Sequence, residues 1–140
     1  MSAQAVLLPV FVQVALMFAL LFMMGAARWR TLGSGETRIK DIALGQQNWP
    51  ARVTQVSNCF RNQFEVPVLF LALIALALPL RKADFVIVLL SWLFVVLRLA
   101  HAFVFVTTNN VPRRGLIWLV GALVLAAMWL YFALNMLLAL

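Results

Sequence analysis

Four long, mostly apolar runs alternate with three polar connections along the chain. The runs cover about residues 5–27, 50–80, 84–106 and 116–140. Each reaches the roughly 20 residues that an α-helix needs to cross the hydrocarbon core of a bilayer. The pattern therefore predicts an all-α integral membrane protein. We expect one domain over residues 1–140, folded as a bundle of four transmembrane helices.

Three breaks separate these runs. Glycine and serine at residues 33–35 open the first connection, which extends to residue 50 and has a short surface helix predicted over residues 37–44. Arg81 and Lys82 form a tight turn between the second and third runs. Residues 107–115 are expected to form a loop, because Pro112 and Gly115 disfavour a continuous helix there.

The second run carries a row of polar side chains. Gln55, Asn58, Asn62 and Glu65 are spaced by three, four and three residues, so they share one face of a helix. Such side chains are costly in hydrocarbon and normally face other helices or a wet cavity. The row is therefore either a polar packing seam or a binding site for a small polar molecule. Pro67, two residues after Glu65, predicts a kink in this helix.

The hairpin of the second and third runs suggests a partner for Glu65. Positions equally distant from the turn lie at equal depth, which sets Glu65 level with Arg98 and Asn62 level with His101. We expect an ion pair between Glu65 and Arg98, with Arg61, one helical turn before Glu65, as the competing cation. These charges either neutralise each other as a structural lock or, because positive charge is in excess, suit an anionic ligand.

The net charge of +7 arises from basic residues at the ends of the apolar runs. Basic connections stay in the cytoplasm. Both termini should therefore face outward, which is the periplasm for the bacterial inner membrane that we expect. Because the basic residues serve membrane orientation, nucleic acid is not an expected partner. Seven basic residues fall in the first and third connections, against two in the second; the seven are Arg28, Arg30, Arg38, Lys40, Arg52, Arg113 and Arg114.

Few other side chains offer chemistry. Cys59 is the only cysteine, so it cannot form an intrachain disulfide, and packing is its simplest role. His101 is the only histidine, so no metal site is expected. Gln13, the one strongly polar side chain inside the first run, should hydrogen-bond to another helix.

The polar row and the third run together resemble the MAPEG family, the membrane-associated proteins in eicosanoid and glutathione metabolism. The similarity to the second-helix signature lies in Arg52, Asn62, Gln63, Phe64, Glu65, Pro67 and Phe70, and the similarity to the third helix and the loop after it lies in Arg98, His101, Phe105, Arg113 and Arg114. The resemblance implies a homotrimer that binds glutathione between neighbouring subunits.

The resemblance also implies roles for individual residues. Asn62 and Glu65 would hold the polar backbone or amino group of glutathione, with assistance from Arg98. Arg113 or Arg114 would stabilise the thiolate, because a nearby cation lowers the pKa of a thiol. The remaining residues of the implied glutathione site are Arg28 or Arg30 at the end of the first helix, Asn58 and His101.

These positions leave three functions open. The first is a glutathione-dependent transferase or peroxidase that acts on a lipophilic electrophile. The second is a non-enzymatic binding protein of the same fold. It stays open because Val66, His101 and Phe105 occupy positions where glutathione-conjugating members often have tyrosines. Asn58 likewise occupies a position where many members have arginine. The third is a small multidrug-type transporter, although such transporters carry an acidic residue in the first helix and this chain has none there.

The orientation of the chain is directly testable. A reporter fused after Leu140 should be active only on the outer face of the membrane, because the basic connections hold the other side in the cytoplasm. Cytoplasmic activity of the reporter would overturn the assignment.

Overall fold

The computed structural model describes residues 1–138, and within them the chain is helical and without strands. The membrane spans are α1 (Ala3–Gly33), the pair α2 (Ala51–Asn62) and α3 (Val66–Ala77), α4 (Phe85–Val106) and α5 (Val111–Leu137). These four spans are long and apolar enough to cross a membrane, so the predicted four-helix membrane bundle is confirmed. The last two residues of the predicted fourth span lie outside the described residues.

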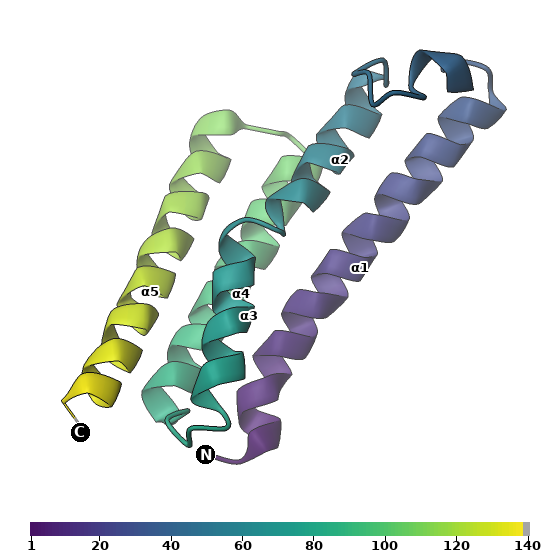
Figure 1. Cartoon of the computed structure of the whole chain (residues 1–140). Helices are drawn as coiled ribbons and strands as arrows, with labels where there is room; N and C mark the ends of the chain where they lie inside the picture. Colours follow the sequence, from purple (N-terminus) through teal and green to yellow (C-terminus); the bar gives the residue numbers. More distant parts are fainter. Residues whose placement is uncertain (139–140) are drawn as a thin grey trace.

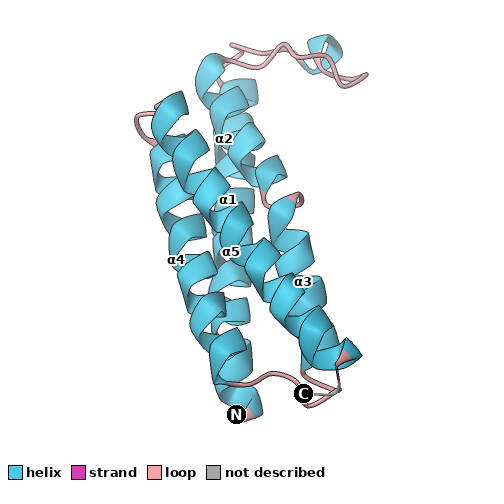
Figure 2. Ribbon diagram, turned by 90° about the vertical axis from the view of Figure 1, so that its left-hand side faces the viewer, coloured by secondary structure: helices cyan, strands magenta, loops and turns pink. Residues whose placement is uncertain are grey.

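The helices pass up and down between two ends of the bundle (Figures 1 and 2). The α1–α2 and α4–α5 connections lie at one end, which we call the loop end. The N-terminus, the end of α5 and the α3–α4 connection lie at the other, the hairpin end. Helix α4 packs against α1, α2 and α5, so it occupies the centre of the bundle.

Apolar and polar packing are separated along the bundle. The main apolar core lies towards the hairpin end and joins α3, α4 and α5, with the rings of Phe70 and Phe94 5.0 Å apart. A smaller cluster around Cys59 and Leu20 lies nearer the loop end. Large apolar side chains such as Phe22 and Phe103 point outward, as they must in contact with lipid. Buried polar side chains therefore concentrate in the loop half.

The second span is not one continuous helix, which corrects the prediction for residues 50–80. Helix α2 ends at Asn62 and α3 begins at Val66, and the backbone of Glu65 (φ −96°, ψ −108°) lies outside the helical region. Pro67 falls in the first turn of α3, where a missing N–H group is tolerated. The expected kink is thus a full interruption, and it precedes the proline.

Gln63 holds this interruption. Its backbone N–H donates to the carbonyl of Phe60 and not to that of Cys59, which an α-helix would use. The Gln63 side chain takes the place of that donor, because its Nε2 donates to the Cys59 carbonyl at 3.2 Å. Its Oε1 accepts from Nε2 of Gln13 on α1 at 3.0 Å. The predicted interhelical hydrogen bond of Gln13 is confirmed, and it ties α1 to the break.

The connections differ from the predictions, and the one between α3 (ending at Ala77) and α4 (beginning at Phe85) is longer than the predicted turn. Within residues 37–44 only η1 (Ile39–Asp41) forms, a single 3₁₀ turn. Helix α5 begins at Val111, inside the predicted loop of residues 107–115, because the side chain of Asn110 caps it and Pro112 suits its first turn. Arg113 and Arg114 therefore lie on the first turn of a helix and not in a loop.

Candidate functional site

A buried arginine lies in the middle of the polar half. Arg98 on α4 is only 2% exposed. Its Nη2 donates to Oδ1 of Asn62 at 2.6 Å, and Nδ2 of Asn62 donates to Oε2 of Glu65 at 3.0 Å. The Asn62 amide thus connects the cation on α4 to a carboxylate in the break between α2 and α3.

The predicted ion pair between Glu65 and Arg98 is wrong. In the described part of the chain the only ion pair within 4.0 Å joins Arg38 and Asp41 on the surface. The equal-depth estimate assumed a continuous helix through Glu65, and the interruption after Asn62 invalidates it. Asn62, not Glu65, meets Arg98, and the competing cation Arg61 is exposed.

Asn62 compensates the buried charge only in part. An amide oxygen is a neutral acceptor, and a buried cation needs its remaining N–H groups satisfied as well. Nε of Arg98 is buried without a hydrogen-bond partner among the described residues, as is Nδ1 of His101. The carboxylate of Glu65 does not reach Arg98 directly, because the Asn62 side chain lies between them. Polar hydrogen-bonding capacity therefore remains unused inside this part of the bundle.

The outward side of this network is open. Asn58, Arg61 and Glu65 are exposed and Asn62 is half-buried, although all four lie inside the span Ala51–Ala77. We call these four residues the polar face of α2, although Glu65 lies just beyond the end of that helix. Charged side chains cannot face hydrocarbon without a large cost. In a single copy of the chain, the polar face has no cover.

A second row of functional candidates follows Arg98 along α4. His101 is 3% exposed, and its ring meets Phe105 edge-on at 5.6 Å. The guanidinium carbon of Arg114 lies 3.9 Å from the centre of the Phe105 ring, and an N–H group of Arg114 donates to the side chain of Asn109. The structure thus distinguishes the two arginines of α5, because Arg114 packs on this row and Arg113 is exposed.

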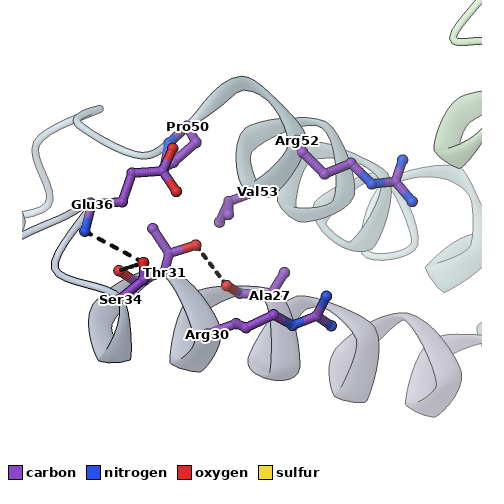
Figure 3. A pocket seen from close by; sticks show the side chains of 8 residues that line it. All are labelled: Ala27, Arg30, Thr31, Ser34, Glu36, Pro50, Arg52 and Val53. Carbon is purple, nitrogen blue, oxygen red and sulfur yellow. Dashed lines mark hydrogen bonds between the residues drawn. The ribbon is translucent and has the colours of Figure 1, made fainter.

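The two arginines near the end of α1 lie elsewhere. Arg28 donates to the hydroxyl of Ser57 at 3.3 Å, and its guanidinium group lies over the ring of Trp49 at 5.2 Å. Arg30 lines a separate pocket at the loop end, together with Arg52 (Figure 3). The structure therefore brings together Arg98, Asn62 and Glu65 in one network, and His101 and Arg114 in the adjoining row. Arg28 and Arg30 lie in separate surroundings, and Asn58 and Arg113 are exposed.

One family of membrane proteins matches most of the chain. The match is to the MAPEG family and covers residues 6–134. The chain belongs to the MAPEG family. Comparison with curated proteins and with solved structures found no match. Membership agrees with the four membrane spans and makes this a multi-pass protein of a glutathione-related membrane family.

Two residues of this MAPEG protein were not singled out as structural determinants from the sequence. Gln63 anchors the break, and Asn109 holds Arg114 from a backbone with positive φ (52°). Asparagine is one of the few residues that tolerate this conformation, and that preference was the available signal for Asn109. Gln55, assigned to the polar row, instead donates to the carbonyl of Phe105 at 2.6 Å and so helps to cap α4.

Among residues 1–138, no three side chains of histidine, cysteine, aspartate or glutamate lie close enough together to hold a metal ion. The polar atoms that are gathered here are amides, guanidinium groups and one carboxylate. This set suits a charged organic ligand.

The role of Asn62 can be tested by stability. Asn62→Leu should lower the thermal midpoint in detergent, because it leaves Arg98 buried without its acceptor, and a hydrogen bond to a charged group contributes about 1.5–3 kcal/mol. Asn58→Leu makes the same chemical change one turn earlier at an exposed position and should cost little. Equal midpoints for the two variants would show that Arg98 does not depend on Asn62.

Proposed function

We propose that this MAPEG protein binds glutathione at the polar face of α2 and activates its thiol towards a lipophilic electrophile, as a membrane glutathione transferase or peroxidase. The observation that carries the proposal is the Arg98–Asn62–Glu65 network, which ends in an open, charged face inside a membrane span. Family membership supports a link to glutathione in general.

The groups on the polar face match the ends of the tripeptide. Glutathione carries an ammonium group, two carboxylates and two amides. The exposed carboxylate of Glu65 suits the ammonium group, the guanidinium group of Arg61 suits a carboxylate, and the amide of Asn58 suits a peptide group. Arg98 is too buried to act mainly by contact. It fixes the orientation of Asn62, which in turn positions Glu65.

Arg114 is the better candidate for the sulfur. Arg114 packs on Phe105 at the end of the row, about 10 Å along α4 from Arg98 at 1.5 Å per residue. A cation at the end of this row favours the thiolate. The thiol proton would pass to water, and the sulfur would form a bond to the electrophilic carbon as the leaving group departs with its electron pair. Arg113 is exposed away from the row and is not expected to contribute.

The cover for the polar face is proposed to be another copy of the chain. A homotrimer with glutathione between subunits is what the family resemblance implies. An exposed Glu65 and Arg61 inside a membrane span support it, because a neighbouring subunit would remove these charges from lipid. The hydrophobic co-substrate would then reach the site from the bilayer.

A non-enzymatic binding protein is the second candidate. Val66, His101 and Phe105 provide no hydroxyl group next to the network, and His101 is buried against Phe105. Glutathione would then bind without reaction. Saturable binding without any thiolate absorbance would favour this candidate.

Calorimetric titration of the detergent-purified protein with glutathione tests the proposal. Wild type should bind saturably. Glu65→Gln should weaken binding by about 10–100-fold, because a charge-assisted hydrogen bond contributes about 1.5–3 kcal/mol. Asp41→Asn removes a carboxylate outside the site and should leave the affinity unchanged. Absence of binding by wild type, or equal affinity for Glu65→Gln, would refute the site.

The ultraviolet absorbance of bound glutathione distinguishes the roles of Arg114 and Arg113. Arg114→Ala should remove the ultraviolet absorbance of the bound thiolate while glutathione still binds, and Arg113→Ala should retain it. Loss of the absorbance in Arg113→Ala alone would reverse the assignment.

A further inference from the structure

A pocket of about 320 Å³ opens at the loop end, between the last turns of α1 and the first turn of α2 (Figure 3). None of its lining residues belongs to the Arg98–Asn62–Glu65 network or to the row that ends at Arg114. The pocket includes Arg30, one of the two α1 arginines that the family resemblance implies for glutathione, but no residue of the polar face of α2. It is lined by Ala27, Arg30, Thr31, Ser34, Glu36, Pro50, Arg52 and Val53.

The pocket lies at the depth of the lipid headgroups. The apolar run of α1 ends at Ala27, which forms one edge of the pocket. The next residues include Trp29, 80% exposed, and Arg30, and exposed tryptophan and arginine at the end of a span mark the membrane interface. From Ala27 to Ser34 the helix rises about 10 Å, slightly more than the thickness of one headgroup layer.

Two arginines face the pocket with unused donors. Arg30 comes from α1 and Arg52 from α2, and their guanidinium groups extend towards the same side of the pocket (Figure 3). Arg30 has no hydrogen-bond partner among the described residues, and Arg52 donates only to the carbonyl of Val106. Neither forms an ion pair in the described part of the chain. A guanidinium group carries five N–H donors, so most of them await an acceptor.

The acidic residue of the pocket does not neutralise this pair. The Glu36 carboxylate extends towards Pro50, and the two guanidinium groups lie on the opposite side of the pocket (Figure 3). Pro50 precedes α2, whose first turn has no side-chain cap, and a helix N-terminus attracts negative charge. With two arginines and one glutamate, the pocket keeps one net positive charge.

We propose that this pocket binds a phosphate group, and that the phosphate belongs to the headgroup of an anionic phospholipid. The planar guanidinium fork matches phosphate oxygens in pairs. Basic pockets between transmembrane helices are known to bind lipid headgroups, and lipid phosphates lie at the depth of this pocket. The bound lipid would bridge α1 and α2 on the loop side of the break in the second span.

Native mass spectrometry of protein purified from an equal mixture of phosphatidylglycerol and phosphatidylcholine tests the site. Wild type should retain phosphatidylglycerol preferentially. Arg30→Gln should reduce this retention about five-fold, which corresponds to the roughly 1 kcal/mol of one basic residue at a membrane surface. Lys40→Gln removes an equal charge from the same connection outside the pocket and should change little. Glu36→Gln should increase retention, an effect that misfolding would not produce.

A second titration identifies the source of the phosphate. Inorganic phosphate is added to lipid-free protein in detergent. Binding of inorganic phosphate that depends on Arg30, without any preference for phosphatidylglycerol, would support the phosphate site and overturn the lipid as its ligand. Equal effects of Arg30→Gln and Lys40→Gln on lipid retention would reveal diffuse surface charge. That result, or no gain in Glu36→Gln, would overturn the pocket itself.

Discussion

The loop half of the molecule depends on how the guanidinium group of Arg98 is accommodated inside a membrane span. It is almost completely buried, and a cation in that position needs acceptors and an opposing charge. Asn62 provides the acceptor and passes the interaction on to Glu65. The interruption of the second span makes this relay geometrically feasible, since Asn62 is the last residue of α2 and Glu65 has left the helix. Gln63 and Gln13 then fix the interruption to α1.

The two halves of the bundle consequently have different roles. Towards the hairpin end, α3, α4 and α5 form an apolar core around Phe70 and Phe94. The polar groups beside this core have partners among the described residues, because Trp129 donates to the carbonyl of Leu69 and Tyr131 to the carboxylate of Asp84. Towards the loop end, amides and arginines replace that core. Their hydrogen bonds are incomplete, as the unpartnered Nε of Arg98 shows, and the charges of the polar face are exposed. Incomplete satisfaction of this kind is typical of a ligand site.

The sequence predicted what the membrane dictates. The lengths of the apolar runs predict four spans because a bilayer has a fixed thickness, and the polar row predicts the face that carries Asn58, Asn62 and Glu65. The register of the second span could not be predicted. No sequence signal indicates that the Gln63 side chain replaces a backbone donor. The depth of Glu65 was therefore predicted for a continuous helix and was wrong. Pro112 was interpreted as a loop former although it starts α5, and only packing on Phe105 separates Arg114 from Arg113.

The central claim, proposed above, is that neighbouring copies of the chain cover the polar face of α2. The most direct test is the mass of the detergent-solubilised protein after the contribution of bound detergent has been subtracted. We expect three times the mass of one chain, because three subunits in a closed ring would cover every polar face. A clean monomer or dimer mass would contradict it.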